Sequence, residues 1–285
     1  MDEFAGRSRC PAVLPGGDRM TRQPAVAGQF YPSDKKTLLD DISSMMTGNP
    51  EKIDAIGVVS PHAGYVYSGP VAAEVFSGIE PAPVYVILSP NHTGSGERFA
   101  VSGQDWHTPL GTLRSEQGLI RELCANTGLA SVDENAHLYE HSVEVQLPFI
   151  QAVSPEARIV PVTISHAGKE EIKEFASALA DSVSGHGEKV IIVASSDMTH
   201  YESRESASIK DGKAIEKILA LDPEGLMETV GSESISMCGY LPVALMLMYA
   251  KRMGAKNASL VKYTDSGEAT GDTSQVVGYA GIVVY

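Results

Sequence analysis

Three short apolar runs of this chain each end on residues that can bind a metal ion or carry a proton. They lead into His62, into His92 and into Asp197-Met-Thr-His200. Imidazole is a common ligand of first-row metals, and a histidine is also a general acid or base near neutral pH. Two histidines in similar Ser-Pro contexts favour a metal site over the alternative, in which each ring only holds a turn through a hydrogen bond.

Two further residues offer chemistry beside these histidines. A carboxylate three residues before an imidazole can orient it, so we expect Asp197 to orient His200 and His200 to act as the acid or base. An equally good interpretation is that Asp197 caps the N-terminus of the segment that follows it. Cys238 precedes an apolar helix, whose N-terminus would lower the thiol pKa and favour a nucleophile or soft metal ligand. From the residues alone, a buried structural cysteine is the commoner case.

A dense polar cluster lies at residues 140–144, where a helix should begin. Glu140 and His141 are candidates for the wall of the site, and Glu144 is a candidate partner for a metal-binding histidine. An ordinary helix cap explains the same residues equally well. The other histidines have no comparable context and are expected to be structural or on the surface: His107, His137, His166 and His186.

Strands that alternate with helices must position these side chains. Runs rich in Val and Ile at 56–62, 84–92 and 190–197 are typical of strands buried on both faces of a parallel sheet, where sites lie at the carboxyl ends of strands. Further strands are predicted at 100–102, 157–163, 259–263 and 279–284, and helices at 35–46, 72–77, 115–126, 142–152, 169–183, 206–220, 223–229 and 239–252. We therefore predict one α/β domain at 23–285, an αβα sandwich with a mostly parallel central sheet, after a flexible tail at 1–22.

Composition narrows the possible partners. The net charge of −14 over 285 residues opposes broad binding to nucleic acid or anionic lipid, so a small-molecule or peptide ligand is expected. The apolar runs are too short to cross a bilayer and no signal-peptide pattern begins the chain, which favours a cytoplasmic protein without a membrane association. The three cysteines form no CxxC pair, so neither a disulfide framework nor a zinc finger is indicated. Serine-hydrolase elbows, phosphate-binding loops and HExxH motifs are also absent.

Taken together, these segments resemble the Memo family, whose fold is similar to that of the class III extradiol dioxygenases. The resemblance runs from about residue 25 to the end of the chain. It is carried by the motifs AGQFY at 27–31, SPHAGY at 60–65, SPNH at 89–92, EHSVE at 140–144, SSDMTH at 195–200 and MCG at 237–239.

The resemblance implies metal ligands at His62, His92 and Cys238, with Asp197 and His200 as nearby pocket residues. The dioxygenases use two histidines and a glutamate for iron(II), whereas a thiolate in the third position admits copper as well as iron or zinc. We therefore expect iron(II) or copper, with zinc less favoured.

Family properties also bear on ligands and partners. Animal members are associated with phosphotyrosine peptides through an aromatic residue that matches Phe30, a role that the acidic charge of this chain disfavours. Phe30, Glu140 and His141 remain the candidate substrate-binding residues. Microbial relatives tend to be encoded beside a radical-SAM protein, which implies a partner in a redox pathway. The leading hypothesis is a metal-dependent oxidoreductase; the alternatives are a zinc-dependent hydrolase and a non-catalytic peptide-binding module.

Overall fold

The computed structural model describes residues 20–46, 48 and 51–285, and its folded domain begins earlier than predicted. Strand β1 (Thr21–Arg22) pairs in parallel with β5 (Asp105–Thr108). Arg22 is 4% exposed and its guanidinium lies 2.6 Å from the carboxylate of Glu144. Residues 21 and 22, which the sequence analysis assigned to the tail, therefore belong to the domain, while the rest of the predicted tail lies outside the described residues apart from Met20.

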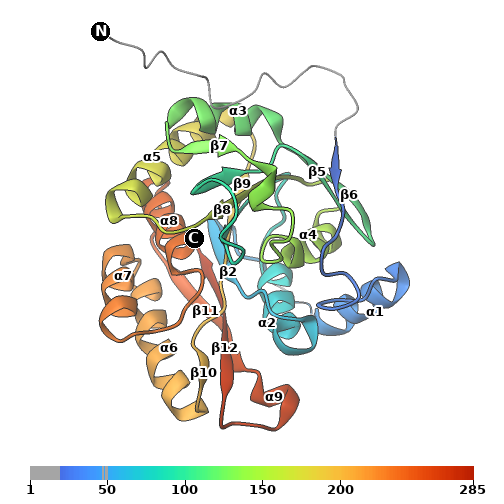
Figure 1. Cartoon of the computed structure of the whole chain (residues 1–285), viewed down its shortest axis with the longest axis vertical. Coiled ribbons are helices and arrows are strands. Elements are labelled where there is room, and N and C mark those ends of the chain that lie inside the picture. The colour runs from blue at the N-terminus through green and yellow to red at the C-terminus, as the bar shows by residue number, and fades with distance from the viewer. Residues whose placement is uncertain (1–19, 47, 49–50) are drawn as a thin grey trace.

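A parallel sheet forms the centre of the molecule (Figure 1). Its neighbouring strands are, in order, β6 (Gly111–Ser115), β8 (Arg158–Ile164), β3 (Val84–Pro90), β9 (Val190–Ser195) and β2 (Gly57–Ser60). The antiparallel strand β12 (Val276–Val284) continues the sheet beyond β2 and also pairs with β11 (Ala258–Asp265). Shorter strands are β4 (Phe99–Val101), β7 (Ala130–Val132) and β10 (His200–Glu202).

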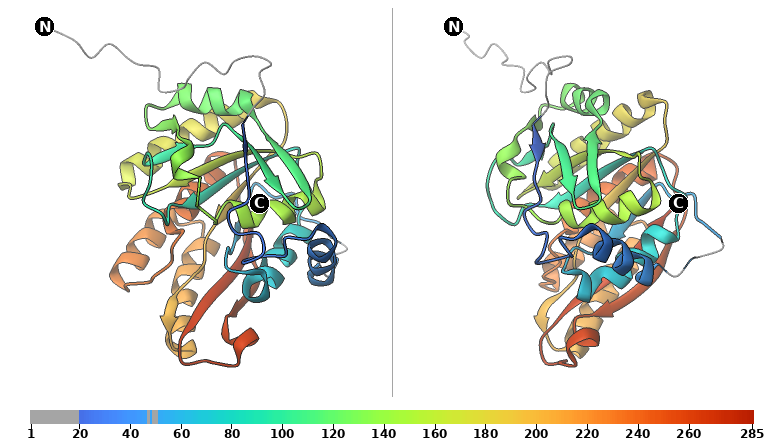
Figure 2. Two further views of the ribbon diagram at one scale, coloured as in Figure 1. Left: turned by 45° about the vertical axis from the view of Figure 1, so that its right-hand side comes forward. Right: turned by 90° about the vertical axis from the view of Figure 1, so that its right-hand side faces the viewer.

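Helices cover both sides of this sheet, as the two views of Figure 2 show. On one side lie α1 (Lys35–Met45), α2 (Tyr65–Ser77) and α4 (Leu147–Val153). On the other lie α3 (Gln117–Asn126), α5 (Lys169–His186), α6 (Arg204–Leu219), α7 (Pro223–Ser232) and α8 (Tyr240–Arg252). Short helical turns occur at Glu134–Ala136, Glu144–Gln146 and α9 (Gly267–Thr270). The predicted αβα sandwich is confirmed.

The central strands are apolar on both faces because each face has its own core. In β9, Ile191 and Val193 pack with the α1–α2–α4 layer, whereas Ile192 and Ala194 pack with the opposite layer. Full burial of each such side chain is worth about 1.5–3 kcal/mol. A polar side chain inside these strands would forfeit that free energy, so the functional groups are confined to the strand ends.

Every strand and helix predicted from apolar patterning is present. The predicted starts of two helices are wrong, because α2 begins at Tyr65 rather than at residue 72 and α4 begins at Leu147 rather than at residue 142, whereas the other ends differ by a few residues. Asp34 caps α1 as expected, because its carboxylate accepts a hydrogen bond from the Thr37 backbone N–H at 2.9 Å. The strands that were not predicted, β1, β5, β6, β7 and β10, are short. Their two to five residues contain no continuous apolar run of the kind that marks the central strands.

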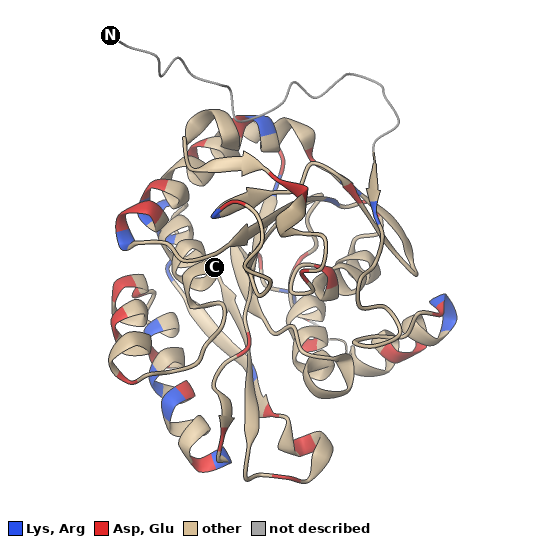
Figure 3. Cartoon of the chain, viewed as in Figure 1, with Lys and Arg blue, Asp and Glu red and all other residues tan. Residues whose placement is uncertain are grey.

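Charged side chains gather on the outer helices, and few lie on the central strands (Figure 3). Among residues 20–46, 48 and 51–285, no helix combines the length and the apolar character that crossing a membrane requires.

Candidate metal centre

Three neighbouring strands deliver the predicted residues to one edge of the sheet. Strand β9 lies between β2 and β3 and is parallel to both. β2 ends two residues before His62, β3 two residues before His92, and β9 two residues before Asp197. The imidazole centroids of His62 and His92 are 5.2 Å apart, so the expected convergence of the strand ends is confirmed.

A third histidine joins the pair. The ligand atoms of His62, His92 and His141 all lie within 4.8 Å of one another. His141 comes from the loop before α4, and its ring centroid is 4.8 Å from that of His92 and 5.6 Å from that of His62. The sequence analysis placed His141 on the substrate wall, whereas the geometry also groups it with the two predicted ligands.

The tautomer of His62 follows from its neighbours. Ser195 Oγ donates its proton to the Ser142 carbonyl oxygen at 2.7 Å, and it also accepts a hydrogen bond from the Gln146 side-chain amide at 2.9 Å. Because that hydroxyl proton is already used, His62 Nδ1 must be the donor in its 2.8 Å contact with Ser195 Oγ. Burial, and next the charges of His92 and His141, hold the pKa of His62 well below its usual value. The ring is therefore neutral, and its Nε2 carries a lone pair rather than a proton.

His92 is held by a carboxylate instead. Its Nδ1 lies 2.9 Å from Glu140 Oε1 and its backbone N–H donates to Glu140 Oε2 at 2.6 Å. Burial alone would lower the pKa of His92, but the hydrogen bond and negative charge of Glu140 outweigh it and raise the pKa. Glu140 is fully buried and also accepts from Ser142, so it orients His92 from behind rather than contacting substrate as we expected. His92 Nε2 is left for a metal.

Cys238 lies next to this cluster, where its Sγ is 3.2 Å from His62 Nε2. Since Nε2 has no proton, the thiol is the donor. Helix α8 begins only at Tyr240, and burial, reinforced by the negative charge of Asp197, raises the pKa of Cys238. The expectation that a helix N-terminus lowers this pKa is therefore wrong for the protein without a metal, because loss of hydration outweighs the helix dipole.

Asp197 and His200 are neighbours that do not form the predicted pair. The Asp197 carboxylate accepts a hydrogen bond from the His62 backbone N–H at 2.7 Å. His200 Nδ1 instead lies 2.9 Å from the Ser236 carbonyl oxygen, so Ser236 orients this ring and leaves Nε2 unpaired. Burial raises the pKa of Asp197 to about 6, against the opposing effects of the His62 N–H bond and the nearby His200.

Glu144 does not support a histidine either. Its carboxylate accepts hydrogen bonds from Arg22, from the Tyr31 hydroxyl at 2.7 Å, and from the backbone N–H groups of Ala25 and Val26. Glu144 therefore fastens the N-terminal segment to the domain. Among the other histidines, His137 is structural as expected: it is fully buried and donates from Nε2 to a backbone carbonyl.

A pocket of about 450 Å³ opens beside the cluster. The predicted residues Phe30, His141, Asp197 and His200 line it, and the Phe30 ring lies 4.8 Å from that of His141. The sequence analysis did not assign roles to the partners Ser195, Gln146 and Ser236. Ser195 ends a buried strand as a polar residue, and this is a signal that could have found it.

The donor atoms fit a metal ion. His62 and His92 each use Nδ1 for a protein hydrogen bond, so Nε2 is the ligand atom that each ring has left, and both rings lie in one cluster with His141. Metal-binding histidines are usually fixed in this way by a second hydrogen bond. Neutral imidazoles with a neighbouring thiol form a set that suits iron, copper or zinc.

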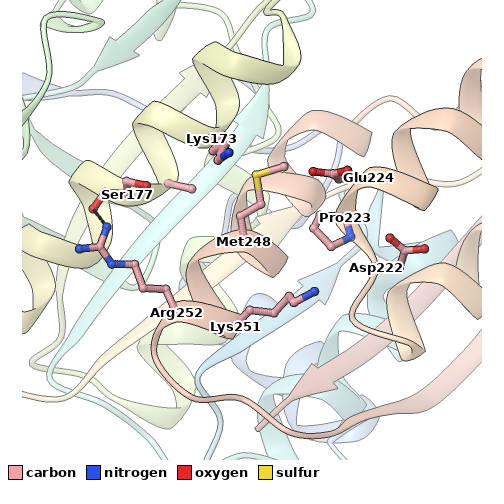
Figure 4. A pocket seen from close by; sticks show the side chains of 9 residues that line it. Lys173, Ser177, Asp222, Pro223, Glu224, Met248, Lys251 and Arg252 are labelled. Carbon is pink, nitrogen blue, oxygen red and sulfur yellow. Dashed lines mark hydrogen bonds between the residues drawn. The ribbon is translucent and has the colours of Figure 1, made fainter.

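A second cavity has a different character. It measures about 580 Å³, lies between α5, α7 and α8, and shares no lining residue with the histidine pocket. Lys173, Lys251 and Arg252 surround Met248 there, opposite Asp222 and Glu224 (Figure 4). Among residues 20–46, 48 and 51–285, no histidine or cysteine lines this cavity, so these residues offer it no soft or imidazole metal ligand.

Comparison with known proteins supports the resemblance seen in the sequence. The family model described as Memo-like protein matches residues 22–283. The MEMO1 family protein of Methanosarcina barkeri is 43% identical over 92% of this chain and 99% of its own. That of Methanopyrus kandleri is 42% identical over 93% of this chain and 99% of its own.

A solved structure agrees at the level of the fold. The crystal structure of the uncharacterized protein JW3007 from Escherichia coli K12 superimposes with a TM-score of 0.52 at 12% identity, over 80% of this chain and 98% of the other. At that identity the likeness concerns the fold alone. The family match over nearly the whole described domain is far more specific, and the chain belongs to the Memo family.

Proposed function

We propose that this chain is a metal-dependent redox protein that holds iron(II) or copper through His62, His92 and Cys238. The observation that carries the proposal is that His62, a member of the three-histidine cluster, also places its Nε2 3.2 Å from Cys238 Sγ. Imidazole and thiolate together suit copper and iron as well as zinc. A bound iron(II) or copper ion would supply one-electron chemistry at the pocket.

The remaining pocket residues take supporting roles in this proposal. His200 is the acid or base, because Ser236 occupies its Nδ1 while Nε2 is unpaired and the side chain lines the pocket. Phe30 and His141, whose rings are 4.8 Å apart, contact the substrate. Glu140 and Ser195 hold the Nδ1–H groups of the two ligating histidines and thereby fix the direction of each Nε2.

A second function is favoured by one specific observation. If His141 rather than Cys238 is the third ligand, the set becomes three histidines, which is a ligand set of catalytic zinc. Zinc in such a site lowers the pKa of bound water to about 7 and promotes hydrolysis. The identity of the third ligand therefore separates the redox function from the hydrolytic one.

The test is elemental analysis of protein that is purified without air, because a thiolate ligand must stay reduced. This requirement also leads us to propose the cytoplasm as its compartment. Wild type is compared with Cys238→Ser and His141→Ala, and His166→Ala serves as the matched control because His166 is exposed and lies outside the cluster. Circular dichroism establishes that each variant is folded.

The redox proposal expects near-stoichiometric iron or copper that falls in Cys238→Ser and is retained in His166→Ala. Zinc that is retained in Cys238→Ser and lost in His141→Ala would support the hydrolase instead. If no metal binds to any of the proteins after reconstitution, both functions are refuted and a non-catalytic peptide-binding module becomes the better description.

A further inference from the structure

Aromatic side chains from four separate segments line the pocket beside the histidine cluster. They are Phe30 from the N-terminal segment, Tyr67 from α2, Tyr201 from β10 and Tyr279 from β12. β10 and β12 run side by side (Figure 1) and are hydrogen-bonded in an antiparallel pair. The pocket therefore gathers aromatic residues from segments that are far apart in sequence, which a single amphipathic helix or strand would not provide.

Two of these aromatic residues, Phe30 and Tyr67, are neighbours in the wall of the pocket. A side chain at Gly64 would touch both Phe30 Cα and the Tyr67 ring at 3.8 Å, so these two residues flank one point of the wall. The Tyr201 ring centroid is 5.9 Å from that of His200, which lines the same pocket. Burial raises the pKa of Tyr279, and the nearby Asp197, Tyr67 and Tyr201 raise it further, so this ring remains a neutral phenol.

Tyr201 is held at the rim in an unusual conformation. Its φ of 58° lies in the left-handed region, which costs a non-glycine residue about 1–2 kcal/mol. The side chain is 73% exposed, so burial in the core does not repay that cost. Strain of this kind persists at functional sites, where the backbone holds a side chain toward a ligand.

The charges around the pocket select against anions. In the described part of the chain, no lysine or arginine lines this pocket, and Asp197 is its one carboxylate. The cavity between α5, α7 and α8 differs, because two lysines and an arginine line it. An organic cation in the histidine pocket would face the carboxylate and the electron-rich faces of aromatic rings, and such rings attract ammonium groups within about 6 Å.

We propose that Phe30, Tyr67, Tyr201 and Tyr279 form an aromatic cage that binds an organic ammonium group, so that the ligand of this pocket is an amine or a quaternary ammonium compound. The inference names the ligand class of the same pocket. It rests on the proposed function only for the reaction that the bound ligand would undergo. Binding itself depends only on the cage and Asp197, and it can be measured without a metal.

The test is a ligand-observed NMR titration of the full, metal-free chain with tetramethylammonium and with tert-butanol, a neutral molecule of similar size. About 0.15 M NaCl is included because it shortens the Debye length to about 8 Å and suppresses diffuse attraction of cations to the acidic protein. We expect tetramethylammonium to bind about tenfold more tightly than tert-butanol, as a few cation–π contacts would give. Benzoate and inorganic phosphate should bind more weakly than either.

Variants locate the binding site. Tyr67→Leu and Tyr201→Leu should each weaken tetramethylammonium binding by about two- to tenfold, whereas Tyr201→Phe, which keeps the aromatic face, should retain it. Tyr139→Leu is the matched control, because Tyr139 is also 73% exposed and close to His141 in sequence but does not line the pocket.

Three results would overturn the cage: equal binding of the cation and the alcohol, tighter binding of benzoate or phosphate, or full binding in both leucine variants. Metal binding is measured separately, on samples of the same proteins that have been reconstituted with iron or copper without air. A protein that binds tetramethylammonium but no metal would refute the proposed redox function and keep the cage, and the reverse result would refute only the cage.

Discussion

The ends of β2 and β3 present two histidines in similar local sequences and place them in opposite environments. His62 is 2% exposed and donates to a neutral hydroxyl, whereas the His92 side chain is 34% exposed and donates to a carboxylate. The pKa of His62 falls well below its usual value and that of His92 rises. Burial therefore sets the low pKa of His62, whereas Glu140, which reaches His92 from a distant part of the chain, sets the raised pKa of that ring. The Ser-Pro sequence before each histidine determines neither shift.

This difference gives the site a closed end and an open end. At the closed end, His62 contacts Ser195 Oγ through Nδ1 and Cys238 Sγ through Nε2. At the open end, His92 reaches solvent, and the buried carboxylate of Glu140 compensates for its charge. A metal ion would meet a neutral, rigid ligand on one side and a ligand that competes with protons on the other.

The largest expected effect is on stability, and it tests how tightly the protein packs around the His62 end of the site. A Cβ at Gly239 would clash with the Ser195 carbonyl oxygen and lie 2.6 Å from Ser196 Cβ. Gly239→Ala should therefore destabilise the protein by about 1–3 kcal/mol, as overpacking of a core does, and the loss is measured by urea unfolding. Gly185→Ala in α5, where the added Cβ meets no atom within 4 Å, is the control and should not destabilise. Equal stability of the two variants would show that the His62 end has room to adjust.

The next effect compares the two groups that orient the histidines. Loss of such a group typically costs about 10–100-fold in metal affinity. Glu140→Gln removes a charged partner of His92 and should lie near the upper limit, whereas Ser195→Ala removes a neutral partner of His62 and should lie near the lower one. Equilibrium competition with a chelator measures both affinities at one pH. A greater loss in Ser195→Ala would reverse the assignment of the closed and open ends.

The same contrast shows what can be predicted from sequence. Long apolar runs predicted the strands that carry His62 and His92, because burial on both faces leaves a continuous pattern. The pairing of each partner with its ring could not be predicted, because Glu140 and Ser195 reach the rings through loops and strand pairing far along the chain, although a polar Ser195 at the end of a buried strand is itself a signal. Glu144 was expected to do what Glu140 does, and only the path of the loop distinguishes these carboxylates. The burial that raises the pKa of Cys238 also depends on distant packing.

Titration of the two rings gives a smaller but more direct readout. NMR of the metal-free protein should find the pKa of His92 above 6.5 and that of His62 well below 6.5. In Glu140→Gln the pKa of His92 should fall, because burial is no longer opposed by a negative charge. The pKa of His62 should change little, since the Glu140 charge is a minor cause of its shift compared with burial. Similar pKa values for His62 and His92 in the wild type would contradict the proposed difference between the closed and the open end of the site.

The smallest effect is the pH dependence of stability at the open end. Because the folded pKa of His92 is raised, its contribution is fully present below about pH 6.5, the unfolded value, and is lost as pH rises through the folded pKa. Glu140→Gln should therefore cost more stability at pH 6 than at pH 8, by at most about 1.4 kcal/mol for each unit by which the substitution lowers the His92 pKa, and by less where solvent screens the partly exposed ring. His62 contributes with the opposite sign, since a lowered pKa gives stability that is present above pH 6.5 and lost as pH falls. Ser195→Ala, which leaves His92 and Glu140 paired, should cost the same at both pH values, and urea unfolding at each pH measures both variants. A cost of Glu140→Gln that does not change with pH would mean that the carboxylate orients His92 through geometry alone, without favouring its charged form.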